Sequence, residues 1–176
     1  MRDRAKAVSF GIIYGQGPYG LSRQLGISMD EAKRFIGAYF ARYPQVRRFM
    51  DDTIRDGTNN GYVSTLMNRR RYVPGLKQTD KTKRAAEERV AVNAVIQGSA
   101  ADMIKVAMIR IHNHLRQSGS QAKLLIQIHD ELLLETPEAE KDAVREMVVR
   151  EMENALPLSV PVKVKWGFGK NWMEVA

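Results

Sequence analysis

Two short apolar runs, residues 123–128 (KLLIQI) and 131–135 (ELLLE), are separated by only His129 and Asp130. Runs of this length are typical of strands, and polar residues stand where the chain has to reverse direction. The sequence therefore predicts an antiparallel β-hairpin with a histidine and an aspartate at its turn. Residues 157–167 carry valines at alternate positions and predict a final strand.

Most of the remaining sequence has helical periodicity, with apolar residues recurring three and four positions apart. Helices are predicted over residues 2–14, 21–25, 29–43, 44–56, 81–117 and 138–155, and a short strand over residues 62–66. Ser28 and Glu31 form a capping box at one helix start. Gly57 is expected to end a helix, and residues 97–99 (QGS) are expected to break the long one. The predicted fold class is α+β, a helical lobe followed by an antiparallel sheet with packed helices.

The chain of 176 residues has 28 Lys and Arg against 20 Asp and Glu, a formal net charge of +8. This excess fits either a polyanionic partner or a solvated basic surface. The absence of cysteine excludes disulfides and thiolate metal sites. No apolar run approaches the roughly 18 residues that span a bilayer. We therefore expect a cytoplasmic protein, associated with the nucleoid if its partner is DNA, and no membrane partner.

The helix predicted at the start of the chain carries two cations and then two aromatic residues at every fourth position: Arg2, Lys6, Phe10 and Tyr14. Side chains at this spacing form one slowly winding stripe. The charged end suits phosphates and the aromatic end suits a sugar and a base. Alternatively, the two aromatic residues belong to the core and the cations lie at its edge. Gly11 favours a close approach, because glycine inside a helix costs about 1 kcal/mol relative to alanine.

This stripe forms the motif Arg-x3-Lys-x3-Phe-Gly-x2-Tyr-Gly, which resembles the fingers-helix motif of family A DNA polymerases, the bacterial DNA polymerase I type. Other stretches resemble the same family in order and spacing. These are residues 65–74 (TLMNRRRYVP), its basic segment after the fingers; residues 88–102 (ERVAVNAVIQGSAAD), its DNA-contacting helix; residues 127–131 (QIHDE), its palm hairpin; and residues 171–172, its C-terminus. The resemblance implies a fingers part over residues 1–62 and a palm part over residues 63–176.

The resemblance implies template-directed DNA synthesis, in which a nucleotidyl group passes from a dNTP to a primer 3′-hydroxyl, in DNA replication and repair. It implies that Arg2 and Lys6 bind the triphosphate, that Phe10 lies against the deoxyribose and that Tyr14 lies at the template-base site. In this family, a phenylalanine at the position of Phe10 goes with poor use of ddNTPs. Lys6 is also implied in catalysis, through the charge that moves during transfer.

The resemblance makes Asp130 the ligand of Mg²⁺, of which the complete enzyme uses two ions, and places Glu131 beside it in a catalytic role. A carboxylate held at a hairpin turn suits Mg²⁺, which prefers oxygen ligands. His129 is implied to contact the primer terminus. His112 and His114 have no metal-ligand spacing and are expected on the surface.

Primer-template DNA is the implied macromolecular partner. Arg89, Asn93 and Gln97 share one helix face, and amide side chains suit the minor groove, where every base pair offers acceptors. The other residues assigned to DNA are Arg71, Lys83, Arg84 and Gln127. Arg69 and Arg70 are further candidates for phosphate contacts. Some of these cations could instead form ion pairs with Asp80, Glu87 or Glu88.

A second family motif, Asp-Tyr/Phe-Ser-x-Ile-Glu-Leu-Arg, supplies another metal-binding aspartate and does not occur in the 176 residues. We therefore expect the isolated chain to be inactive in synthesis. It is either the C-terminal part of a polymerase, whose N-terminal remainder could be a separate chain, or a non-catalytic DNA-binding module derived from one. A degenerate helical interaction protein is disfavoured, because a scaffold needs none of the motif residues.

A further expectation follows from the resemblance. A palm sheet without its first strands has uncovered edges, which predicts self-association of the isolated chain. Ser9 and Asn68 stand where asparagine and glycine are frequent in the family.

Overall fold

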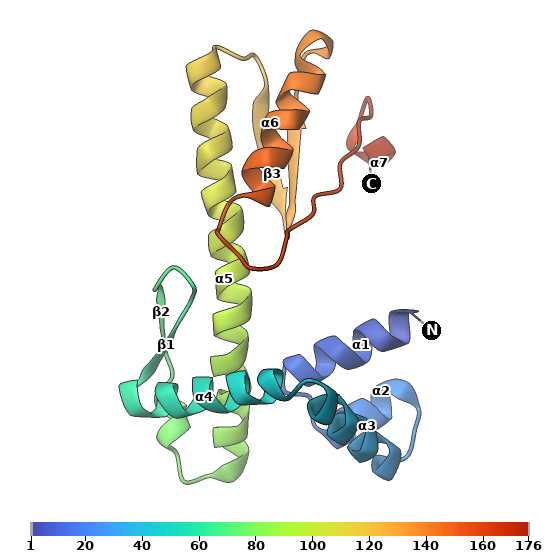
Figure 1. Cartoon of the computed structure of the whole chain (residues 1–176), viewed down its shortest axis with the longest axis vertical. Helices are drawn as coiled ribbons and strands as arrows, with labels where there is room; N and C mark the ends of the chain where they lie inside the picture. Colours follow the sequence, from blue (N-terminus) through green and yellow to red (C-terminus); the bar gives the residue numbers. More distant parts are fainter. Residues whose placement is uncertain (1, 176) are drawn as a thin grey trace. The chain divides into compact units, whose positions relative to one another are not determined.

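The structure is a computed structural model that describes the backbone of residues 2–175 and the side chains of residues 8–175. The chain forms two compact units, Met1–Gly98 and Ser99–Ala176. Helix α5 (Lys81–Ser118) belongs in part to each. The α+β fold class is confirmed (Figure 1). No helix among the described residues is long and apolar enough to cross a membrane.

The first unit begins with four helices, α1 (Arg2–Ile13), α2 (Pro18–Leu25), α3 (Met29–Arg42) and α4 (Pro44–Asn60). Gly26 ends α2 in the left-handed conformation, with φ +67°. The capping box predicted at Ser28 and Glu31 is present at the start of α3. These signals lie within a few residues of the helix ends they set, so the sequence displays them directly.

Gly57 does not end a helix as expected, because α4 continues through it to Asn60. A β-carbon at Gly57 would lie 2.9 Å from side-chain atoms of both Leu76 and Val63. The glycine therefore serves close packing and not termination.

The β1–β2 hairpin follows α4, with β1 (Tyr62–Ser64) antiparallel to β2 (Arg70–Tyr72). The 3₁₀ helix η1 (Pro74–Lys77) then leads to α5. The core of this part of the unit consists of buried residues from β1, from the segment around η1 and from α5: Val63, Val73, Leu76 and Ala91.

Helix α5 is continuous, and the break predicted at residues 97–99 is absent. A β-carbon at Gly98 would lie 2.7 Å from the Cγ2 methyl of Thr65. The glycine that suggested a break is instead the point where the β1–β2 turn approaches the helix.

The second unit contains the end of α5 and the hairpin predicted from the two apolar runs, with β3 (Lys123–Ile128) antiparallel to β4 (Glu131–Glu135). The helix predicted over residues 138–155 is η2 (Glu138–Glu140) followed by α6 (Lys141–Glu153), and α7 (Trp172–Val175) lies near the C-terminus. The core joins α5 and α6 through buried residues that include Ala107, Ile111, Leu115 and Val144, and the partly buried Leu132 and Leu134 of β4 pack against it.

The final strand predicted over residues 157–167 is wrong, because no described residue of that segment is in a strand. A strand needs a neighbour for its backbone hydrogen bonds, and β3 and β4 pair only with each other among the described residues. The segment instead contacts α6: the backbone N–H of Val164 donates to Glu153 at 3.1 Å, and the guanidinium of Arg145 lies 4.6 Å from the ring centre of Trp166.

Candidate nucleic-acid interface

The aromatic half of the stripe lies at the end of α1, where Phe10 is on an open face and Tyr14, in the turn that follows, is half-buried. The side chain of Phe10 is 46% exposed, whereas Ile12 on another face is 1% exposed. The ring centres of Phe10 and Tyr14 lie 6.0 Å apart, with 32° between the ring planes. This exposure disfavours the interpretation of Phe10 as a core residue. The side chains of Arg2 and Lys6 lie outside the described residues, so their assignment to the triphosphate stays a prediction.

The end of α1 is closely packed. Gly15 has φ +77°, and a β-carbon there would lie 2.6 Å from Cγ of Arg89. The aliphatic part of the Arg89 side chain therefore packs against the turn after α1, although Arg89 as a whole is exposed. This contact brings a residue assigned to DNA next to the helix assigned to the nucleotide.

Sequence reasoning missed Gln16, which lies at the same turn. Its backbone N–H donates to the carbonyl of Gly11 at 2.8 Å, and its side chain fills the space that Gly11 and Gly20 leave open. Glycines on both sides of a lone glutamine are the one signal in the sequence that could have drawn attention to it.

The three consecutive arginines of the β1–β2 hairpin have different surroundings. Arg69 donates from Nη2 to the carbonyl of Gly98 at 3.0 Å. The guanidinium of Arg70 lies 4.5 Å from the ring centre of Tyr62. Arg71 is exposed and pairs with Val63 across the hairpin. Arg69 and Arg70 thus have contacts within the chain, and the assignment of Arg71 to DNA stays a prediction.

Asn68, at the tip of this hairpin, has φ +61°. Asparagine tolerates the left-handed region better than most residues other than glycine. The departure from the glycine frequent in the family therefore keeps the turn conformation.

The polar face of α5 differs along its length. Gln97 is exposed, whereas Oδ1 of Asn93 is buried without a hydrogen-bond partner among the described residues.

Lys83 and Arg84 form ion pairs with Asp80 and Glu88, at 4.0 Å and 3.1 Å. The ion-pair alternative is thus confirmed for these two cations. Exposed pairs of this kind contribute only about 0–1 kcal/mol, so they leave the cations able to exchange partners.

The β3–β4 turn holds Asp130 in a defined place. His129 has φ +54°, and Nε2 of Gln127 donates to the His129 carbonyl at 2.9 Å. Gln127, assigned to DNA from the sequence, therefore braces the turn in this structure. Asp130 is exposed, and Glu131 opens β4 opposite Ile128.

The described residues contain no group of three or more His, Asp or Glu side chains that could hold a metal ion. Mg²⁺ commonly takes only one or two carboxylates, with water and substrate phosphates completing its ligands. An exposed carboxylate on a braced turn, as at Asp130, fits one such ligand position.

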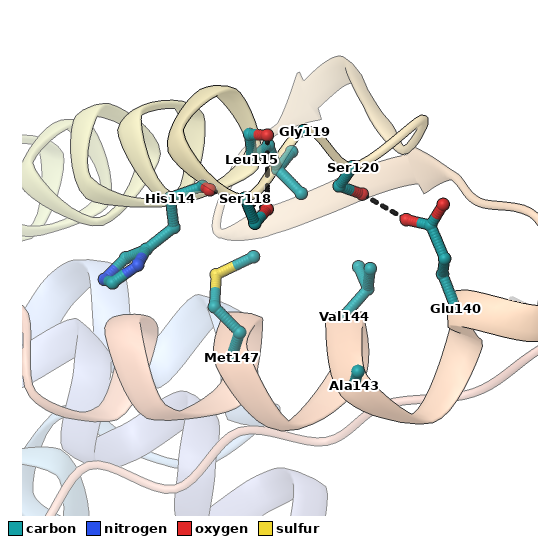
Figure 2. Close-up of a pocket in the computed structure, with 9 residues that line it drawn as sticks. All are labelled: His114, Leu115, Ser118, Gly119, Ser120, Glu140, Ala143, Val144 and Met147. Carbon is teal, nitrogen blue, oxygen red and sulfur yellow. Dashed lines mark hydrogen bonds between the residues drawn. The ribbon is translucent and has the colours of Figure 1, made fainter.

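A surface pocket of about 370 Å³ lies elsewhere in the second unit, between the end of α5 and the start of α6 (Figure 2). Leu115, Val144 and Met147 form its apolar part, and Ser120 bonds Glu140 at its rim. His114 at its edge is exposed, as predicted, and its Nε2 lies 3.3 Å from Glu151. None of the residues assigned to nucleotide, metal or DNA lines this pocket.

Comparison with known proteins points to one family. The family described as DNA polymerase family A matches residues 1–174. DNA polymerase I of Caldicellulosiruptor bescii is 49% identical over 174 residues, which are 99% of this chain and 20% of that protein. DNA polymerase I of Geobacillus stearothermophilus is 46% identical over 174 residues, again 99% of this chain and 20% of that protein. The chain thus spans about a fifth of the length of these relatives.

A solved structure is similar over almost the whole chain. It is the POL domain of Pol1 from M. smegmatis in complex with DNA primer-template and dNTP. The TM-score is 0.94 and the sequence identity 45%, and the match covers 97% of this chain and 30% of that one.

Proposed function

This chain belongs to DNA polymerase family A, and on that premise we propose that it serves template-directed DNA synthesis, the transfer of a nucleotidyl group from a dNTP to a primer 3′-hydroxyl. The observation that carries the proposal is the pairing of the exposed Phe10 on α1 with the half-buried Tyr14 just after it, which continues the four-residue spacing of Arg2 and Lys6. A nucleotide has phosphate, sugar and base in the same order.

In the proposed complex Arg2 and Lys6 hold the triphosphate, Phe10 contacts the deoxyribose and Tyr14 borders the template base. Fixed cations at the phosphates offset the negative charge that shifts toward the leaving group during transfer. The packing of Gly15 against Arg89 supports the aromatic end of α1, so that Phe10 and Tyr14 meet the nucleotide from a fixed backbone.

Asp130 is the proposed Mg²⁺ ligand, and Glu131 lies next to it in sequence. When bound, Mg²⁺ ions would activate the primer 3′-hydroxyl and stabilise the leaving pyrophosphate. Gln127 keeps the turn in place through its bond to the His129 carbonyl, and so supports the backbone from which Asp130 projects. His129 is then available at the same turn for the primer terminus.

Primer-template DNA is the proposed partner of Arg71, Arg89, Asn93 and Gln97, with Lys83 and Arg84 as exchangeable phosphate contacts. The similar POL domain from M. smegmatis is in complex with both DNA primer-template and dNTP, which supports this proposal.

Primer extension tests the proposal. We expect no extension by the 176-residue chain alone, and extension when a separate polypeptide supplies the second aspartate motif. Asp130→Asn should abolish the restored activity. Asp142→Asn, which changes an exposed carboxylate on α6, is the matched control and should leave the activity intact.

The results separate the open alternatives. Extension by the chain alone would overturn the expected inactivity of the isolated chain. DNA binding without extension, even with the added polypeptide, would favour the alternative function, a non-catalytic DNA-binding module.

A further inference from the structure

The turn of the β1–β2 hairpin is fixed to α5 at Gly98. Nη2 of Arg69 donates to the Gly98 carbonyl at 3.0 Å. Thr65, which is 7% exposed, places its Cγ2 methyl 2.7 Å from where a β-carbon of Gly98 would stand. We call Thr65, Arg69 and Gly98 the hairpin latch.

The turn itself is internally bonded. Oγ1 of Thr65 accepts from the backbone N–H groups of Met67 and Arg69, at 3.3 Å and 3.2 Å. The backbone N–H of Thr65 donates to the carbonyl of Arg69 at 3.0 Å. The hairpin therefore meets the helix as a preformed unit and not as a loose loop.

The latch explains a residue that is otherwise unfavourable. Glycine inside a helix costs about 1 kcal/mol relative to alanine, and α5 continues beyond Gly98 to Ser118. The bond from Arg69 to the Gly98 carbonyl is compatible with the helix, because a carbonyl oxygen has two lone pairs. The Gly98 oxygen can therefore accept from Arg69 and from a backbone N–H of α5.

Two residues assigned to DNA lie within two positions of latch residues in the sequence. Gln97 precedes Gly98 on α5, and Arg71 follows Arg69 by two positions on the hairpin. A shift of the hairpin along the helix would change the distance between a side chain suited to the minor groove and a side chain suited to a phosphate.

We propose that Arg69 is a positioning residue, which with Thr65 and Gly98 fixes Arg71 relative to Gln97 so that hairpin and helix bind duplex DNA as one surface. This inference rests on the proposed function, because it assumes that both residues contact primer-template DNA. It assigns Arg69 an intramolecular role, the bond to Gly98, and not a phosphate contact of its own.

The salt dependence of DNA binding distinguishes the two roles. Each phosphate contact changes the slope of log K against log salt concentration by about 0.9 for duplex DNA. A positioning residue weakens binding without changing the number of phosphates that are neutralised.

The experiment measures binding of the full chain to a fluorescent primer-template by anisotropy over a series of salt concentrations. We expect Arg69→Ala and Gly98→Ala each to weaken binding about tenfold with an unchanged slope. Arg71→Ala is the comparison, and it should reduce the magnitude of the negative slope by about 0.9, because one phosphate contact is lost. Thr65→Ser removes the methyl group but keeps the hydroxyl, so it should restore binding to the Gly98→Ala chain.

A control separates positioning from loss of stability. Leu21→Ala leaves a cavity at a fully buried side chain of α2, in the same unit but far in sequence from the latch, and should lower the melting temperature without changing DNA affinity below the transition. Equal weakening of DNA binding by Leu21→Ala and Gly98→Ala would overturn the positioning role.

The remaining outcomes are also decisive. A slope of smaller magnitude for Arg69→Ala would make Arg69 a phosphate contact. Failure of Thr65→Ser to restore the DNA affinity of the Gly98→Ala chain would contradict the contact between Thr65 and Gly98. If the unsubstituted chain binds DNA but Arg69→Ala binds equally well, only this inference fails. If the unsubstituted chain binds no DNA, this inference fails, whereas the proposed function is judged by primer extension with the added polypeptide.

Discussion

The side-chain oxygen of Gln16 lies 2.0 Å from the position that a β-carbon on Gly11 would occupy. On its other side, the Cγ of the same glutamine lies 2.8 Å from the corresponding position at Gly20. Gln16 thus joins α1 to α2 through space that only glycine leaves open. Its Oε1 is buried without a hydrogen-bond partner among the described residues, so the amide is held there by packing.

Gly11→Ala should destabilise the chain, because the added methyl group overlaps the Gln16 amide. Overpacking of this kind costs about 1–3 kcal/mol, more than the helix propensity of alanine returns. Thermal unfolding measures the effect. Gly37→Ala is the matched control, because Gly37 lies in α3 with nothing near its missing β-carbon, and this change should stabilise. Adding Gln16→Ala should restore stability to the Gly11→Ala chain. If the loss of stability persists in the double variant, the contact between Gln16 and Gly11 is contradicted.

Phe10→Tyr should raise the ratio of ddNTP to dNTP incorporation. The family resemblance associates phenylalanine at this position with discrimination against ddNTPs, and the exposed Phe10 ring leaves room for a hydroxyl group. The ratio is measured by primer extension with the polypeptide that supplies the second aspartate motif. An unchanged ratio would refute the proposed contact between Phe10 and the sugar. Phe35→Tyr, an exposed change on α3, is the control.

The isolated chain should self-associate. The β3–β4 sheet has only two strands among the described residues, and Leu125 and Ile126 on β3 are 54% and 47% exposed. Unpaired strand edges beside apolar side chains favour association. Light scattering should show a mass above that of the monomer, and Leu125→Lys should lower it. A stable monomer at high concentration would contradict the prediction.

The stability of α3 should depend on pH through Glu31. The backbone N–H and then the hydroxyl of Ser28 bond its carboxylate, and this lowers the pKa of Glu31 below its usual 4.5. A lowered pKa in the folded state gives a contribution that is complete above pH 4.5 and is lost as the pH falls through the folded value. The difference in melting temperature between the chain and Glu31→Gln should therefore vanish in acid.

Two variants check the origin of that pH dependence. Ser28→Ala should cost about 1 kcal/mol and remove the pH-dependent difference as well. Glu146→Gln, an exposed change on α6, should leave the acid limb of the stability curve unaltered. Persistence of the difference without the serine would show that another group lowers the pKa of Glu31.

The β3–β4 hairpin and the cap at Ser28 were predictable because each depends on residues close together in the sequence. Continuity of α5 was not predictable, since the partner that fits against Gly98 is Thr65, which is far away along the chain. The prediction of a final strand was wrong for a related reason. Alternating valines indicate a face that can be buried, but a ladder partner makes a strand, and residues 157–167 have none among the described residues.

The candidate site was indicated by spacing in the stripe on α1, where Phe10 is exposed, and the roles assigned to the residues of that stripe stay predictions. It was not predictable where identical residues take different roles. Arg69, Arg70 and Arg71 are equivalent in the sequence, and only the turn geometry and the alternation of β2 assign one to Gly98 and another to Tyr62. Gln16 was missed although glycines flank it, because a glutamine after a helix is ordinarily a surface residue.

The cluster of Val63, Val73, Leu76 and Ala91 draws its neighbours from α4 and α5, and all of its members lie within residues 54–95. Every member of the cluster belongs to the first unit, so its formation requires no residue of the second unit. During synthesis this block can therefore condense on the nascent chain before the turn that carries Asp130 has left the ribosome.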